Sequence, residues 1–310
     1  MPEIRMRIKK EIQQQSIRTN VMTDDDGMKR RISNYDKQTC WLNSCLQLIL
    51  CGMDHLADIQ FNSLLGKELT RIQKQNLIDP SRLKRMLQED IDRNSERLHA
   101  ENILTGQQCA RDLLIILSEN KASWFDVYQA FHHVTVQTLR CPFCNRESVY
   151  RSSELYRELS CPPNNSRLRN YIEQIFSCTE EVEFVCEGCR KRGLFKKSLK
   201  LCSRESSEFI IFVLTRGILD QVNNYNNKVD AKDNCIIEDE EGNQHTYEPI
   251  AVIEHEGTFT SSRKTQGHYV CDVKNIHDNT WYSTNDEQKP RRLLKQNLTK
   301  FGYVILYRRI

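Results

Sequence analysis

Apolar residues recur at helical spacing in three stretches of the first 130 residues. The first stripe lies between residues 42 and 49 and predicts a buried helix that begins at or next to Cys40. The other two stripes cover residues 83–91 and 110–117. The polar sequence between these two, rich in Asn, Asp and Arg, predicts a loop. The first part of the chain is therefore expected to be mainly helical.

Beyond Phe131 the pattern changes to that of β-strands. Residues 133–139 alternate between polar and apolar side chains, and residues 209–214 form a continuous apolar run of the length of a buried strand. After a polar stretch that predicts a loop, residues 221–234, three more candidate strands follow at 250–254, 269–274 and 303–308. Helices early in the chain and strands late in it predict an α+β fold rather than an alternating parallel one.

The N-terminal segment differs from the rest of the chain. Residues 1–31 alternate charges and glutamines, with an acidic triplet at Asp24–Asp26 and a basic run at Lys29–Arg31. They contain no apolar run that could serve as a signal peptide. We expect residues 1–31 to form a disordered, charged leader and residues 32–310 to form a single folded domain.

Composition and charge narrow the classes of function. The chain has 310 residues, of which 38% are hydrophobic and 28% charged, and a formal net charge of +3. So small a charge gives no field that would draw the protein to nucleic acid or anionic lipid, and no stretch approaches the roughly 18–20 apolar residues that span a bilayer. We therefore expect a monomer of the cytoplasm or nucleus with no nucleic-acid or membrane partner. Since thiols stay reduced there, metal binding and catalysis explain the 13 cysteines better than disulfides do.

Four cysteines have the spacing of a metal site. Cys141 and Cys144 form one C-x-x-C knuckle, Cys186 and Cys189 form a second, and 41 residues separate the two. Both thiolates of such a knuckle can reach one tetrahedral ion. The alternatives are two unrelated pairs of buried thiols or a redox dithiol, and the presence of two knuckles favours structural zinc over both. A zinc ribbon with basic residues after it could also bind nucleic acid, but little aromatic sequence is interleaved here.

Cys40 and His268 are candidates for nucleophilic catalysis. At the start of a helix, unpaired backbone amides and the positive end of the dipole favour a thiolate, although position alone suits a buried structural cysteine better. His268 follows Gly267 at the start of a predicted strand, and a glycine there allows another backbone to approach the imidazole closely. Cys–His catalysis also needs a polar group that fixes the ring's tautomer. Asn285 and Asp286 lie 17 and 18 residues further on, where a returning strand would bring them to the histidine.

Taken in order, these residues resemble the motifs of the ubiquitin-specific protease family. The cysteine box of that family reads T-C-Y-L-N-S-x-L-Q, its second box reads Q-Q-D-A-H-E-F-L, and its two C-x-x-C knuckles match the quartet in order and spacing. Its histidine box reads Y-x-L-x-A-V-x-x-H-x-G and then G-H-Y-x-A-Y-V, followed by W-Y-x-F-[DN]-D and a closing aromatic strand. The segments that resemble these boxes are Thr39–Gln47, Gln107–Leu114, Tyr247–Gly257, Gly267–Val273, Trp281–Asp286 and Tyr303–Arg308.

The resemblance covers the chain from about Asn34 to Ile310 and implies both a fold and an activity. The fold would be that of a papain-like cysteine protease, with a thumb (32–130), zinc-ribbon β-fingers (131–216) and a palm (217–310). The activity would be that of a thiol-dependent deubiquitinase, which hydrolyses the isopeptide bond after the C-terminal Gly-Gly of ubiquitin. Ubiquitin and its conjugates would be the partners, and zinc would be a structural cofactor only.

The resemblance also implies a role for individual residues. Cys40 would attack the isopeptide carbonyl, His268 would take the thiol proton and return it to the leaving lysine amine, and Asn285 would orient the imidazole. The residues that it implies for substrate contact are Gln108, Tyr269 and Trp281.

The segment before Cys40 departs from the family pattern N-x-G-N-T-C. Lys37 stands where the glycine is expected, and Asn34 lies six positions upstream of the thiol instead of five. A one-residue bulge could restore Asn34 as an oxyanion donor, or Gln38 could replace it, or Asn34 could merely cap a turn. Asp286 is expected to support the site next to these residues.

Other features leave the substrate open. Cys109 replaces an acidic residue of the second box, and Thr284 replaces the aromatic residue before the third catalytic position. The acidic run Glu238–Glu241 could attract the basic tail of ubiquitin, although such a run is more often a solvated loop. A divergent member could therefore act on another ubiquitin-like modifier such as SUMO, or bind ubiquitin without catalysis.

Overall fold

The computed structural model describes residues 28–34, 37–56, 59–94, 108–119, 123–216, 227–258, 266–293 and 302–310. The predicted leader lies outside the described residues as far as residue 27. Its predicted boundary at residue 31 is wrong, because Arg31–Ile32 forms strand β1 and Arg30 makes an ion pair of 2.8 Å with Asp54. The chain is thus fixed to the folded body a few residues earlier than its composition indicates.

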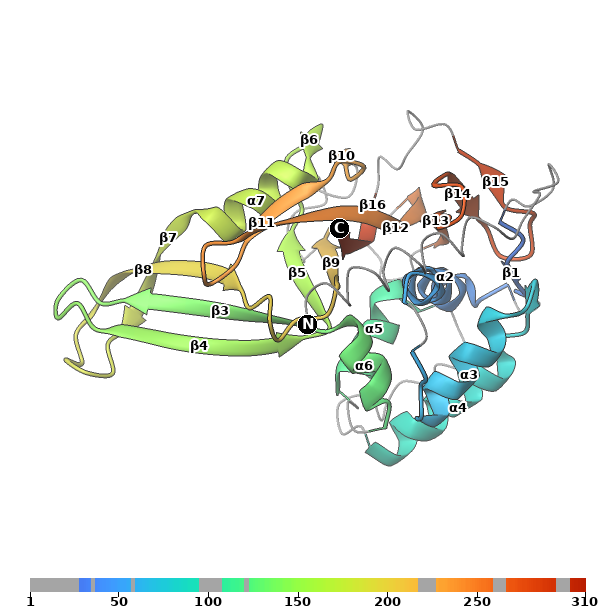
Figure 1. The fold of residues 1–310 in the computed structure, drawn as a ribbon, viewed down its shortest axis with the longest axis horizontal. Coiled ribbons are helices and arrows are strands. Elements are labelled where there is room, and N and C mark those ends of the chain that lie inside the picture. The colour runs from blue at the N-terminus through green and yellow to red at the C-terminus, as the bar shows by residue number, and fades with distance from the viewer. Residues whose placement is uncertain are drawn as a thin grey trace, which may run out of the picture.

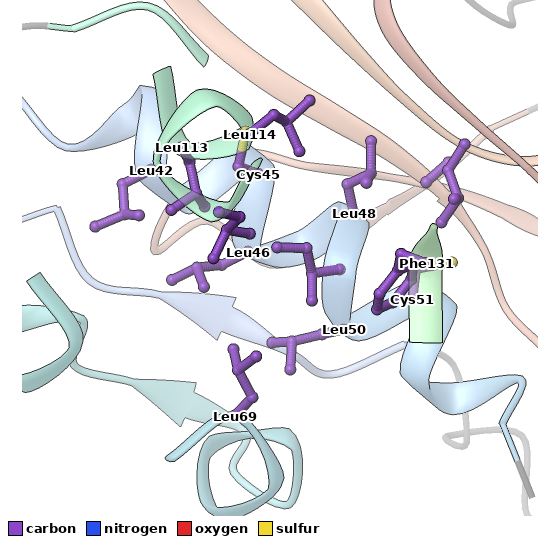
Figure 2. Close-up of a cluster of buried hydrophobic side chains, with 14 of the residues drawn as sticks. Leu42, Cys45, Leu46, Leu48, Leu50, Cys51, Leu69, Leu113, Leu114 and Phe131 are labelled. Atoms are coloured by element: carbon purple, nitrogen blue, oxygen red, sulfur yellow. The ribbon is translucent and has the colours of Figure 1, made fainter. Parts of the chain in front are cut away.

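Helices form the thumb, at the right in Figure 1; α2, α4 and α5 lie where the helical spacing predicts them, and α3 and α6 are additional. They are α2 (Cys40–Asp54), α3 (Leu64–Gln73), α4 (Ser81–Asn94), α5 (Ala110–Glu119) and α6 (Phe125–Phe131), accompanied by the short parallel pair β1 and β2 (Leu77–Ile78). Nearly every residue of α2 is buried, which makes it the central helix. Its leucines pack against Leu113 and Leu114 of α5 and against Leu69 of α3 (Figure 2). None of the described helices has the length and apolarity needed to cross a bilayer.

The palm is an eight-stranded sheet with the order β15-β14-β13-β12-β16-β9-β5, and β11 pairs with β12 beside this path. Its strands are β5 (Tyr156–Ser160), β9 (Phe209–Thr215), β11 (Cys235–Glu238), β12 (Gln244–Thr258), β13 (Gln266–Lys274), β14 (Trp281–Thr284), β15 (Arg291–Arg292) and β16 (Gly302–Arg309). Ala251 and Ile253 pack in the core that holds α2, whereas Val252 packs in the core that holds α7 (Leu168–Ser177). This alternation shows that the palm sheet is covered on both faces.

The fingers extend away from the palm as a four-stranded antiparallel sheet with the order β4-β3-β8-β7 (Figure 1). These strands are β3 (His133–Arg140), β4 (Glu147–Glu154), β7 (Thr179–Val185) and β8 (Arg192–Leu201), and a small parallel pair, β6 (Ser166–Arg167) with β10 (Val229–Asp230), lies outside both large sheets. The predicted range of 131–216 for the fingers needs correction, because β5 and β9 belong to the palm sheet. The physical reason is the burial of β9, whose apolar run is covered on both faces.

Candidate active site

Cys40 is the first residue of α2, as the apolar stripe predicts. Thr39, at the N-cap, makes no side-chain hydrogen bond to the first helical amides, and the first turn contains no acidic residue. The positive end of the helix therefore acts on Cys40 without a competing negative group in that turn. Cys40 exposes only 1% of its surface, so a substrate carbonyl can reach the thiol only after neighbouring groups move.

His268 lies near the start of β13, and Asn285 directly follows β14. The antiparallel register, which pairs Cys271 with Thr284, brings the two together, and Nε2 of His268 lies 2.7 Å from Oδ1 of Asn285. Nδ1 is thereby left for Cys40. The hydrogen bond with Cys40 is the largest cause that raises the pKa of His268 to about 9, against the opposing effect of burial. The three predicted catalytic residues thus lie together.

Asp286 connects three parts of the site. One carboxylate oxygen accepts a hydrogen bond of 2.7 Å from Nδ2 of Asn43 in α2, and the other accepts one of 2.7 Å from Nδ2 of Asn34. The second oxygen also lies 3.7 Å from Nε2 of His268. Asp286 adopts a positive φ of 46°, an uncommon conformation for a residue with a side chain. The carboxylate is therefore held as a fixed negative charge beside the imidazole.

Asn34 braces the segment that leads into α2. Its Oδ1 accepts hydrogen bonds from the backbone N–H of Thr39 (3.0 Å) and from the Thr39 hydroxyl (2.7 Å), while its Nδ2 donates to Asp286. The sequence left two roles open for Asn34, capping a turn or donating to the oxyanion. The contacts in the structure are those of a cap. Lys37 has a φ of 56°, the left-handed region in which a glycine is least strained, at the position where the family pattern has glycine. Gln38 is exposed two residues before Cys40.

Two residues of this network were not assigned a role from the sequence. Asn43 lies inside the cysteine box and is buried, and Glu287 accepts hydrogen bonds from the backbone N–H of Asn34 and the hydroxyl of Ser33. A polar residue on an otherwise buried helix is a signal for Asn43, because it must find a partner. Nothing in the local pattern points to Glu287.

The glycine before His268 makes room for a side chain. A Cβ atom at Gly267 would collide with the ring of His255 and would lie 3.1 Å from the backbone oxygen of Glu256, so the imidazole makes the closest approach and a neighbouring backbone the next. The His255 ring packs edge-on against Tyr269 at 4.7 Å between centroids. Burial and the nearby His268 lower the pKa of His255 to about 4, which keeps it neutral. His255 thus acts as a packing residue beside His268.

The three residues implied for substrate contact lie in different surroundings. Gln108 is half-buried just before α5. Tyr269 is 6% exposed, and its hydroxyl lies 3.8 Å from Sγ of Cys109. Trp281 pairs with Lys274 at the far end of β13 and β14, about 20 Å along the strand from His268 at the usual rise per residue. The structure therefore places Trp281 away from Cys40 and His268, and its contact with substrate stays a prediction.

The acidic run Glu238–Glu241 is held by cations of the finger base. Glu238 pairs with Lys200, Glu240 with Arg151, and Glu241 with Arg204, at 2.6, 2.9 and 2.7 Å. Asp239 is buried and accepts hydrogen bonds from the Ser203 hydroxyl and the ring of His245. Glu240 and Glu241 are exposed in the turn between β11 and β12, so this part of the run is a solvated loop, and its charges are paired with the fingers of the same chain.

The four knuckle cysteines converge at the tip of the fingers. Their sulfur atoms all lie within 4.8 Å of one another, and the Sγ–Sγ distances are 3.8 Å for Cys141–Cys189 and 3.6 Å for Cys144–Cys186. A tetrahedron with metal–sulfur bonds of about 2.3 Å has edges of about 3.8 Å. In both knuckles a backbone N–H points at the first sulfur at 3.4 Å, from Phe143 and from Cys189. The quartet thus has the geometry to hold a metal ion.

Comparisons with known proteins agree with this geometry. The model of the family described as ubiquitin carboxyl-terminal hydrolase matches residues 31–307. Ubiquitin carboxyl-terminal hydrolase 48 of Danio rerio is 28% identical over 169 residues, which cover 51% of this chain and 15% of that protein. Ubl carboxyl-terminal hydrolase 18 of Mus musculus is 23% identical over 286 residues, which cover 80% of this chain and 74% of that protein. This chain therefore spans a small part of the first relative and about three quarters of the second.

Solved structures show the same fold. A chain of the SAGA Ubp8/Sgf11/Sus1/Sgf73 DUB module bound to ubiquitin aldehyde superposes with a TM-score of 0.64 at 15% identity, covering 95% of this chain and 72% of that one. The same module with a cysteine-to-alanine variant of Ubp8, bound to monoubiquitin, gives a TM-score of 0.65 at 15% identity, covering 98% and 74%. Since the family model spans nearly the whole folded part of the chain, the resemblance drawn from the motifs is confirmed, and this chain belongs to the ubiquitin carboxyl-terminal hydrolase family.

Proposed function

We propose that this chain is a thiol-dependent deubiquitinase that cleaves the isopeptide bond after the C-terminal Gly-Gly of ubiquitin. The observation that carries the proposal is the arrangement of His268, hydrogen-bonded through Nε2 to Asn285 and on its other side to Cys40. Membership of the ubiquitin carboxyl-terminal hydrolase family supports it.

In the proposed reaction, Cys40 attacks the isopeptide carbonyl while His268 holds the thiol proton. His268 then gives this proton to the leaving lysine amine, and water, activated by the same imidazole, hydrolyses the thioester. Asn285 fixes the orientation of the ring, and the Asp286 carboxylate, 3.7 Å from Nε2, stabilises its charged form. For the oxyanion we propose the backbone N–H of Cys40 together with the side chain of Gln38, since Asn34 is engaged by Thr39 and Asp286.

We propose zinc as the ion of the finger quartet, in a structural role only. Four thiolates in a tetrahedral arrangement form a closed site with no open coordination position, which is typical of structural zinc. Catalysis by Cys40 and His268 needs no metal. None of the 13 cysteines forms a disulfide, and this supports a reducing compartment such as the cytoplasm or nucleus.

A second candidate substrate is another ubiquitin-like modifier. The mouse relative, which matches more of this chain than the zebrafish one, is named a Ubl carboxyl-terminal hydrolase. The same three catalytic residues would perform the same chemistry on such a modifier, so only the surface that holds its body would differ.

The deciding experiment is covalent capture by modifiers that carry an electrophilic propargyl group at the C-terminus. Wild type is compared with Cys40→Ala, and Cys178→Ala serves as the matched control because Cys178 is an exposed cysteine outside the site. We expect labelling by the ubiquitin probe that is lost in Cys40→Ala and kept in Cys178→Ala. Labelling by a SUMO probe or another modifier alone would move the assignment to that modifier. Ubiquitin binding without labelling by any probe would contradict the proposal and indicate an inactive binding module.

A further inference from the structure

A cavity of about 660 Å³ lies in the palm at the end of β13 and β14 that is remote from His268. Its apolar wall consists of Trp281, Leu293 and Pro249, and the first two are each 9% exposed. This volume is within the range of sites that bind small ligands or short peptide segments. The tryptophan of the W-Y segment, which does not reach the active site, thus lines a separate cavity.

The charged residues that line this cavity are all positively charged. Lys232, Lys274 and Arg292 are among them, and none of the described residues that line it is acidic. Asp230 holds Lys232 at 3.1 Å and Glu248 holds Lys274, and neither carboxylate lines the cavity. Arg292 is exposed, and no described carboxylate lies within ion-pair distance of it. Arg292 thus adds a positive charge without a described counter-ion beside the apolar wall, and this favours a ligand that presents negative charge near an apolar group.

The remaining donors and acceptors suit a peptide backbone. Asn234 and Asn279 line the same cavity, and their amides can both donate and accept hydrogen bonds, which matches the N–H and C=O groups of a peptide. An inorganic phosphate would use only the donors and would leave the apolar wall uncovered. The chemistry thus favours a peptide over a small anion.

The basic lining continues beyond this cavity. A neighbouring cavity of about 490 Å³ shares Lys274 and is lined by Lys29, Lys74 and His277. The single carboxylate among its described lining residues, Asp54, is engaged by Arg30 and by Gln73. A ligand with several negative charges could therefore follow the surface from one cavity to the other.

From this lining we infer that the Trp281 cavity is a docking site for an acidic segment of a partner protein. The segment would place an aromatic or large aliphatic side chain against Trp281 and Leu293 and would set its carboxylates against Arg292, Lys232 and Lys274. This inference does not depend on the proposed hydrolase activity, because the cavity is separated from Cys40 and His268 by the length of β13.

The test uses fluorescein-labelled pentapeptides and fluorescence anisotropy with the full chain. The probe has a central phenylalanine with two glutamates on each side, and the matched peptides carry lysines in place of the glutamates or alanine in place of the phenylalanine. Arg292→Glu and Lys232→Glu are compared with Arg204→Glu, which reverses an exposed cation at the finger base. Thermal unfolding and ubiquitin-probe labelling of each variant show whether the fold and the active site are intact.

We expect saturable binding of the glutamate–phenylalanine peptide, about tenfold weaker in Arg292→Glu and in Lys232→Glu and unchanged in Arg204→Glu. Replacement of the central phenylalanine by alanine weakens binding, and labelling by the ubiquitin probe stays the same in all three variants. Absence of saturable binding to the wild type, equal binding of the lysine peptide, or unchanged binding in Arg292→Glu would each overturn the inference.

Discussion

The protonation of His268 decides how the candidate site responds to pH. Because Cys40, Asn285 and Asp286 raise its pKa to about 9, the imidazole stays charged through neutral pH. We expect the alkaline limb of kcat/KM for ubiquitin–aminomethylcoumarin to fall near pH 9 and not near the ordinary histidine value of about 6.5. A limb at about pH 6.5–7 would show that the contact with Cys40 does not hold the proton.

The raised pKa of His268 also affects the stability of the folded chain. The pKa of His268 is higher in the folded chain than in the unfolded one, so its contribution to the free energy of unfolding is fully present below about pH 6.5 and is lost as pH rises through about 9. Urea unfolding of wild type and His268→Gln at several pH values measures this difference. The two curves should converge above about pH 9.

A second prediction concerns Asp286, whose carboxylate is held by Asn34 and Asn43. In Asp286→Asn the new amide would face two other amide donors, and the imidazolium would lose the carboxylate that lies 3.7 Å from its Nε2. We expect a fall in kcat of about tenfold or more and an alkaline limb moved down by about one pH unit. Asp233→Asn, a half-buried carboxylate outside this network, is the control and should change neither quantity.

Residues of the candidate site can be predicted from the sequence when a local motif marks them, but not when their role depends on long-range contacts. Cys40 is predicted because it begins a helix and His268 because it begins a strand, and the ordered motifs add Asn285. The contacts of Asp286 with Asn34 and Asn43 join residues 252 and 243 positions apart, and no local pattern contains them. The same holds for the ring of His255 against Gly267, where the sequence predicts a close approach but not the group that makes it.

At the scale of elements, the two knuckles are expected to fold around one ion. Their turns are alike, with left-handed residues at Asn145 and Arg190, each with φ of 56°, directly after the second cysteine. Cys186→Ser or chelation of the metal should lower the free energy of unfolding by more than about 3 kcal/mol and release one zinc per chain. Cys178→Ser, an exposed cysteine outside the quartet, should do neither. An unchanged melting temperature without zinc release would contradict the assignment.

The elements themselves were largely predictable, and the sheets to which they belong were not. Apolar patterns in the sequence give the positions of α2, α4, α5, β3, β9, β13 and β16. Burial of one face leaves a period in the sequence, and burial of both faces leaves a continuous apolar run, as in β9. No pattern in the sequence indicates which strands pair with each other. The predicted range of the fingers therefore included β5 and β9, which pair within the palm sheet. The polar stretch predicted as a loop at 221–234 lies outside the described residues as far as residue 226.

At the scale of the whole molecule, the hairpin between β11 and β12 holds the fingers at their base. Asp239, 1% exposed, accepts hydrogen bonds from Ser203, His245 and the backbone of Asn243, and these together lower its pKa against the effect of burial. Its contribution to stability is present above the unfolded value of about 4 and is lost as pH falls below it. Because Ser203 follows the finger strand β8, its hydrogen bond to Asp239 joins the hairpin to the base of the fingers.

We expect Asp239→Asn to destabilise the chain by about 2 kcal/mol, because buried donors lose their acceptor. It should also raise KM for intact ubiquitin substrates while leaving kcat for a short Gly-Gly peptide amide unchanged, since the catalytic residues lie elsewhere. Asp230→Asn provides a matched control at a partly exposed carboxylate. Equal loss on both substrates would show that the hairpin acts on the catalytic residues and not through the fingers.

The network around Asp286 also has a consequence for how the protein is made. Cys40 and Asn34 are translated early, whereas His268, Asn285 and Asp286 come more than 220 positions later along the chain. Contacts of such high sequence separation are the slowest to form during folding. A nascent or partly folded chain would therefore carry its thiol without a base. In the proposed reaction, hydrolysis would then begin only when the native topology is complete.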